Sequence, residues 1–145
     1  IKVRACGPVL ATMGIAYIKA ALTAARESGV RLMVHIGDPQ WNVDPAITQQ
    51  LLPLLQADDL ITHLYTGAPG KVLDSNRNVL PELIDANERG VEFDPAHGRM
   101  NMSFEVAKRM MEQGIRPASI STDITKPGRL GVVIERCLEP FQIFA

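Results

Sequence analysis

Arg31-Leu-Met-Val-His35 is a short apolar segment that ends on a histidine, and this arrangement recurs along the chain. Asp59-Leu-Ile-Thr-His63 has the same form, and Ala118-Ser-Ile-Ser-Thr-Asp123 ends on an aspartate. Each segment has the length and composition of a buried strand. Helix-like segments separate them, so the pattern predicts strand–helix units with a polar group at the carboxyl end of several strands.

The same pattern extends over most of the sequence. Glycines stand where predicted helices end and strands follow, as at Gly29, Gly90 and Gly114. Strands alternating with helices predict a parallel sheet covered by helices. The predicted strands are Ile1–Ala5, Arg31–Ile36, Leu60–Leu64, Val91–Asp94 and Ala118–Thr122, and the predicted helices are Gly14–Ser28, Pro45–Leu55, Val79–Arg89, Ser103–Gln113 and a weaker one at Leu130–Leu138.

Two architectures fit this order of elements. A complete (β/α)₈ barrel takes roughly 200 to 250 residues, so five strands in 145 residues correspond to a partial TIM-barrel-like fold. The alternative is an open, doubly wound sheet, in which ligands also gather at the carboxyl ends of the strands. Periodicity does not separate the two. We expect one domain over residues 1–145 that is a piece of a longer chain.

The bulk composition excludes several classes of protein. The chain is 46% hydrophobic and 21% charged, with a net charge of −1. The near-neutral charge argues against nucleic acid as the main partner. The apolar stretch Val9–Ala25 contains Lys19 and Gly14, which favours a buried helix over a membrane span. The two cysteines, Cys6 and Cys137, form no close pair, so we expect a reducing, cytoplasmic location.

Three side chains at strand ends are candidate metal ligands: His35, His63 and Asp123. Neutral imidazole and carboxylate groups are good ligands for zinc and similar ions. Asp123 could also accept the proton of a metal-activated water. The alternatives are a hydrogen-bonded histidine pair with a structural role and an aspartate that caps the following turn.

Three further residues have a functional and an ordinary interpretation. Lys2 and Arg4 share one face of the first strand. Lysine is rare in an apolar strand, but a solvated chain end is the simpler explanation for Lys2. Arg4 could bind a substrate carboxylate or pair with a nearby acid. His97 could contact substrate or a metal, or it could be held by Asp94 in a structural loop.

Five segments together resemble the amidohydrolase superfamily, and more narrowly its dihydroorotase-related deacetylase branch. The resemblance runs from Ile1 to about Leu130. Each motif alone is weak, but five in the same order at strand–helix spacing are fairly specific. The segments are Ile1-Lys-Val-Arg4, Met33-Val-His-Ile-Gly37, Ile61-Thr-His-Leu-Tyr-Thr-Gly67, Arg89-Gly-Val-Glu-Phe-Asp-Pro-Ala-His-Gly98 and Ile120-Ser-Thr-Asp-Ile-Thr125.

The resemblance implies a (β/α)₈ barrel with one or two zinc ions, of which this chain supplies about strands 4–8. It implies that Lys2 is a lysine carboxylated by CO₂ that bridges the metals. His35 and His63 would be ligands of one metal, and Asp123 a ligand and the general base. His97 would face the substrate.

The chain also departs from the pattern of this superfamily. The His-x-His pair that holds the other metal is absent, because no two histidines are separated by a single residue. A partial barrel leaves open strand edges, so we expect self-association or pairing with the missing half.

Three hypotheses about function follow. The first is a metal-dependent amidohydrolase or deacetylase that cleaves an amide or ester acyl bond of a small molecule by metal-activated water. The second is an inactive barrel fragment that serves as a binding or assembly module. The third is a lyase or isomerase on the same fold, which fold alone does not exclude.

Overall fold

Four short parallel strands form one sheet in the computed structural model, which describes residues 1–125 apart from 41, 42 and 99. The strands are β1 (Lys2–Arg4), β2 (Met33–His35), β3 (Leu60–Thr62) and β4 (Glu92–Asp94), and they lie side by side in sequence order. The helices are α1 (Gly7–Met13), α2 (Ile15–Glu27), α3 (Ile47–Leu51), the 3₁₀ turn η1 (Leu52–Leu54), α4 (Pro81–Glu88) and α5 (Phe104–Glu112).

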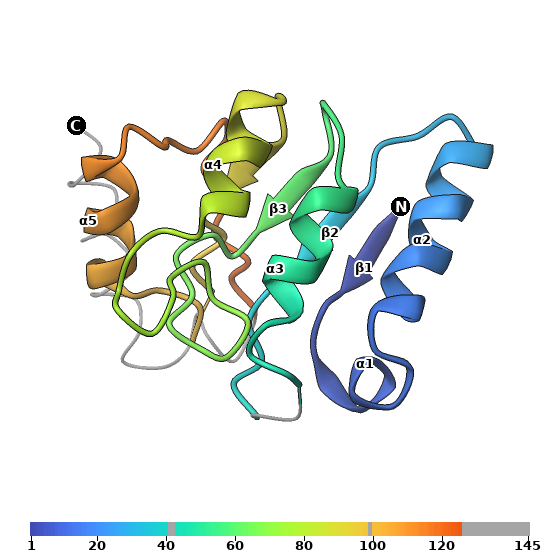
Figure 1. The fold of residues 1–145 in the computed structure, drawn as a ribbon, viewed down its shortest axis with the longest axis horizontal. Coiled ribbons are helices and arrows are strands. Elements are labelled where there is room, and N and C mark those ends of the chain that lie inside the picture. Colours follow the sequence, from blue (N-terminus) through green and yellow to red (C-terminus); the bar gives the residue numbers. More distant parts are fainter. Residues whose placement is uncertain (41–42, 99, 126–145) are drawn as a thin grey trace.

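The strand register separates the two faces of the sheet. Val3, Val34, Ile61 and Phe93 pair across the four strands, and all four are buried. Residues that pair in a parallel sheet point to the same face. Helices α2, α3 and α4 lie on one side of the strands (Figure 1). The four buried residues therefore mark the face of the sheet that packs against these helices.

The opposite face is polar and partly open. Lys2 and Arg4 are exposed, and Met33, Leu60 and Glu92 are only half-buried. A hollow of about 370 Å³ lies over this face between Lys2, Met33 and Leu60. A doubly wound sheet carries helices on both faces and reverses its strand order. Sequential strand order with α2, α3 and α4 on one side is instead the arrangement of a TIM barrel, so the partial-barrel expectation is confirmed.

The predicted strand at Ala118–Thr122 is not a strand in the structure. It begins next to β4, where the Ala118 amide donates to the Phe93 carbonyl at 2.8 Å. Further along, the Ser121 amide donates to the Asp94 carboxylate at 2.9 Å. The side chain of Asp94 therefore accepts the hydrogen bond that a backbone carbonyl of β4 would accept if this segment were a fifth strand. The predicted helix at Leu130–Leu138 and Cys137 lie outside the described residues.

The predicted helix Gly14–Ser28 corresponds to α2, but the apolar stretch Val9–Ala25 is not one helix. The chain forms two helices that meet at 102°, because Gly14 adopts φ 57° and ψ −146° between them. Val9 and Met13 on α1 are about half exposed. Across the described residues no single helix has the length and hydropathy to cross a bilayer, and α1 and α2 meet that test only as a bent pair.

The open face leads to a prediction about the isolated chain. We expect it to associate as its concentration rises, because the half-buried apolar side chains Met33 and Leu60 gain contacts in an assembly. Leu60→Lys should shift the equilibrium toward monomer in sedimentation velocity experiments. Met13→Lys, on exposed α1, is the control and should leave it unchanged. Equal association of wild type and Leu60→Lys would show that another surface is used.

Candidate metal centre

A buried histidine pair stands at the carboxyl ends of β2 and β3. His35 is the last residue of β2, and His63 follows β3 directly. The His35 and His63 rings meet edge to face with centroids 4.0 Å apart. Nε2 of His63 lies 2.9 Å from Nδ1 of His35. The sequence prediction that these two residues converge is confirmed by this contact.

The backbone selects the tautomer of His63. Its Nδ1 lies 2.6 Å from the carbonyl oxygen of Ala96. A carbonyl oxygen can only accept, so Nδ1 carries the proton and Nε2 of the neutral ring is left with a lone pair that can accept. Nε2 then accepts from Nδ1 of His35. Fixing one ring nitrogen by a backbone carbonyl is the usual way in which a protein presents the other nitrogen to a metal.

Burial keeps both imidazoles neutral. Burial is the largest cause, and together with the neighbouring His63, Arg4 and Lys2 it lowers the pKa of His35 to about 3, while Asp38 opposes the shift. Burial also lowers the pKa of His63, although the Ala96 carbonyl and the Asp123 carboxylate act in the opposite direction. Neutral imidazole is the form that binds metal ions.

The basic residues of β1 lie near this pair. Arg4 pairs with His35 in the strand register, and Lys2 stands two residues earlier on the same face. The charge of Lys2 acts on the pKa of both His35 and His63. Arg4 also lines a hollow of about 350 Å³ with Cys6, Tyr17 and Gln40. Lys2 and Arg4 are both exposed, which is what a solvated end of a strand would show.

Asp123 approaches the pair from the segment after β4. Its Oδ2 lies 3.6 Å from Nε2 of His63, and its side chain is 48% exposed. Its backbone has φ 47°, and His63 has φ 70°. Positive φ is uncommon outside glycine and asparagine. Both residues adopt this conformation where the segment after β3 meets the segment after β4.

The donor atoms have a spacing suited to a metal, although the set is incomplete. Zinc bonds of about 2.0–2.1 Å in a tetrahedron place neighbouring ligand atoms about 3.3 Å apart. The two separations around His63 Nε2 are 2.9 Å to His35 and 3.6 Å to Asp123. Within the described residues, no group of three or more His, Cys, Asp and Glu side chains is arranged to hold a metal ion as it stands.

His97 is buried nearby in the loop after β4. Its Nδ1 donates to the Gly98 carbonyl at 3.0 Å. Asp94, which the sequence offered as the partner of His97, instead accepts hydrogen bonds from Thr62, Ser119 and Ser121.

Asp94 is a site residue that the sequence analysis did not identify as a candidate. It is the last residue of β4, where it pairs with Thr62 of β3, and Thr62 in turn pairs with His35 of β2. Strand-end position and parity, which selected His35, would have selected Asp94 as well. Asp94 is 3% exposed, and its charge raises the pKa of His63.

The chain is similar to segments of known enzymes. It is 32% identical over 124 residues to a deacetylase of Brucella anthropi and 30% identical over 124 residues to a deacetylase of Agrobacterium fabrum. These matches cover 86% of this chain but only 30% and 29% of the relatives. The chain therefore spans under a third of the length of these curated relatives. No family model matches the sequence.

Solved structures give the same result. An adenine deaminase superposes with a TM-score of 0.79 at 32% identity, over 89% of this chain and 34% of that one. A dihydroorotase superposes with a TM-score of 0.67 at 32% identity, over 84% and 30%. Both neighbours belong to the amidohydrolase superfamily.

This chain matches a segment of an amidohydrolase-superfamily barrel. The resemblance drawn from the five motifs is thus confirmed, including the expectation that only part of the barrel is present.

Proposed function

We propose that this chain supplies the C-terminal part of the metal centre of an amidohydrolase that removes an acyl group from a small molecule. The observation that carries the proposal is the His35–His63 pair, in which the Ala96 carbonyl keeps the proton of His63 on Nδ1 and Nε2 unprotonated, the form a ligand nitrogen needs. The similarity to deacetylases supports an amide or ester substrate of the acetyl type.

In this proposal His35 and His63 hold a divalent metal, with zinc as the first candidate. Asp123 would be a third ligand, and Lys2, carboxylated by CO₂, would be a further one. When bound, the metal would supply Lewis-acid polarisation of the acyl carbonyl and activation of the attacking water.

The chain's own residues bind substrate and move the proton. Asp123 takes a proton from the attacking water at its carboxylate and returns it to the nitrogen or oxygen of the leaving group. His97 faces the substrate, and Arg4 binds an anionic part of the substrate. In this proposal, the other ligands of the metal come from the rest of a complete barrel. The proposal also places the enzyme in the cytoplasm.

Cobalt binding to the chain tests the proposal. Co²⁺ replaces zinc in sites of this kind and gives a visible spectrum that reports its ligands. We expect one equivalent to bind, and His35→Ala and His63→Ala to weaken binding at least about tenfold. Circular dichroism confirms that each variant is folded. Exposed Glu27→Gln on α2 is the control. Binding that is unchanged in both histidine variants would contradict the proposal.

Arg4 leads to a separate prediction about substrate choice. A charge-assisted hydrogen bond is worth about 1.5–3 kcal/mol, so Arg4→Gln should raise KM about 10- to 100-fold for an acylated substrate that carries a carboxylate. The matching substrate without a carboxylate should show no change. Steady-state kinetics in a protein with the complete barrel compares the two. An equal rise for both substrates would exclude recognition of the carboxylate by Arg4.

An assembly module is the second candidate function. It is favoured by the open sheet face and by the incomplete ligand set within the described residues. This candidate expects association without stoichiometric metal, so metal analysis of size-exclusion fractions distinguishes it from the hydrolase.

A further inference from the structure

The Asp94 carboxylate at the end of β4 is fully engaged by its neighbours. Oδ1 accepts from the Ser119 hydroxyl at 3.1 Å and from the Ser121 amide at 2.9 Å. Oδ2 accepts from the Thr62 hydroxyl at 3.1 Å and the Ser121 hydroxyl at 2.6 Å. A carboxylate has about four lone-pair sites. Asp94 therefore has no remaining capacity to bind a metal or substrate directly.

Three of these four hydrogen bonds hold one segment, residues 119–121. That segment enters next to β4 through the Ala118 amide and leaves through the Thr122 carbonyl, which accepts from the Gly98 amide at 2.8 Å. Asp123 is the next residue, and its Oδ2 lies 3.6 Å from His63. The route of the chain from β4 to the histidine pair is thus fixed largely by one side chain.

The side chain of Asp123 is not what fixes its own position. It is 48% exposed, and within the described residues it contacts the ring of His63 through Oδ2. Its backbone adopts φ 47°, a conformation that persists in a non-glycine residue only where surrounding contacts impose it. The anchor next to it is the contact of the exposed Ser121 with the buried Asp94.

We propose that Asp94 is a positioning residue, which holds the 119–121 segment so that the Asp123 carboxylate faces His63. The inference rests on the proposed function for its consequence in catalysis, because Asp123 is there the proton carrier and a ligand. Asp94 also raises the pKa of His63 through its charge. The two effects differ in one respect: positioning acts only through Asp123, whereas the charge acts with or without it.

A double-mutant cycle separates these effects. Co²⁺ affinity is measured for the wild-type chain, Asp94→Ala, Asp123→Asn and the double variant. We expect Asp94→Ala to weaken binding about 10- to 100-fold in the wild-type background and less than about twofold in the Asp123→Asn background. Asp94→Asn should recover part of the affinity. The same loss in both backgrounds would overturn the proposal.

Two matched variants test the direction of the effect. Ser121→Ala removes a hydrogen bond that Asp94 uses to hold the segment, and it should weaken Co²⁺ binding in the same direction. Thr62→Val removes a hydrogen bond from the β3 side and leaves the segment attached. It should have little effect. Equal effects of the two variants would mean that Asp94 acts as a general structural residue.

A readout without metal keeps the inference independent of the proposed function. In the metal-free chain, hydrogen exchange of the Ser121 amide should accelerate at least about tenfold in Asp94→Ala, because its buried acceptor is lost. The ¹⁵N signals of the His63 ring should move toward those of Asp123→Asn. If no variant binds Co²⁺, the proposed function fails, and these spectra alone decide the role of Asp94. Unchanged exchange at Ser121 would refute that role.

Discussion

Asp123→Asn is expected to lower kcat for acyl hydrolysis about 100- to 10,000-fold, the range that a positioned acid–base group contributes. Asparagine has the same shape as aspartate but neither takes nor returns the proton of the attacking water. KM should change little if substrate binding depends on other residues. The measurement is steady-state kinetics of a protein that holds this chain within a complete barrel, since the chain spans about 30% of its relatives.

Metal analysis belongs with this measurement, because Asp123 lies 3.6 Å from Nε2 of His63 and is proposed as a ligand as well. A variant that retains stoichiometric metal but loses turnover identifies the proton-transfer role. A variant that loses both identifies the ligand role. Glu112→Gln on the exposed face of α5 is the control and should keep full activity. Unchanged turnover in Asp123→Asn would remove this residue from the mechanism.

The fold was predictable because the sequence repeats one simple unit. Each predicted strand from Ile1–Ala5 to Val91–Asp94 contains an observed strand of three residues. The apolar residue at each strand centre packs against the helices, and this produces the pattern that the sequence shows. Glycines at the helix ends follow the expected rule, as in Gly90 with φ 88°.

The part that could not be predicted depends on contacts between distant residues. Ala118–Thr122 has the composition of a strand, but the amide and the hydroxyl of Ser121 donate to the side chain of Asp94, 27 residues away. The bend at Gly14 likewise depends on how α1 and α2 pack. Periodicity records which face of an element is buried, and it does not record which side chain replaces a backbone partner.

The candidate site divides in the same way. Convergence of His35 and His63 followed from strand-end position, which the parallel topology guarantees. The tautomer of His63 could not be predicted from strand-end position. It is set by the carbonyl of Ala96, which lies in a loop and has φ 33°. The roles of Lys2 and His97 stay predictions.

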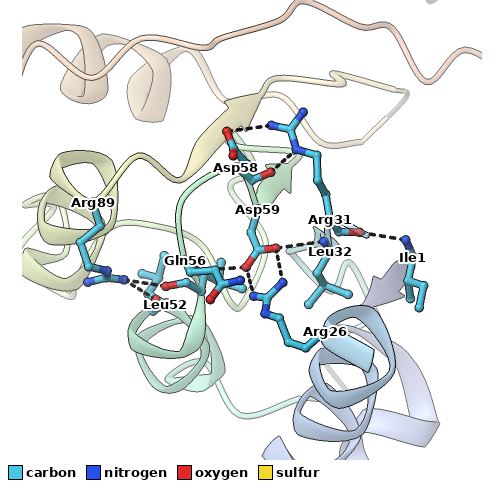
Figure 2. A network of polar contacts seen from close by, with 10 residues as sticks. Ile1, Arg26, Arg31, Leu32, Leu52, Gln56, Asp58, Asp59 and Arg89 are labelled. Carbon is cyan, nitrogen blue, oxygen red and sulfur yellow. Dashed lines mark hydrogen bonds and ion pairs between the residues drawn. The ribbon is translucent and has the colours of Figure 1, made fainter. Parts of the chain in front are cut away.

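Asp59→Ala is expected to destabilise the fold by about 3–5 kcal/mol, which is the cost of breaking a buried ion pair. Asp59 precedes β3, at the end of the sheet opposite to the histidines, and its side chain is 1% exposed. Figure 2 shows the Arg26 guanidinium from α2 bound to both of its carboxylate oxygens, with the amides of Leu32 and Gln56 donating at 2.9 Å and 3.0 Å. Alanine leaves all three donors without this acceptor.

The pH dependence identifies the charge as the source of this stability. Burial raises the pKa of Asp59, but the hydrogen bonds from Arg26, Gln56 and Leu32 outweigh it and hold the pKa below its ordinary value. A carboxyl group with a lowered folded-state pKa stabilises the fold above its unfolded pKa of about 3.9. That contribution is lost as pH falls through the folded-state value.

Urea unfolding of wild type and Asp59→Asn between pH 7 and pH 3 tests this. Asparagine has nearly the same shape without the charge, so the difference in unfolding free energy should be largest at neutral pH and shrink below about pH 4. Glu112→Ala removes an exposed ion pair of α5 and should cost under about 1 kcal/mol. A difference between wild type and Asp59→Asn that stays constant over this range would show that hydrogen bonding and shape stabilise this end of the sheet, and that the charge of Asp59 does not.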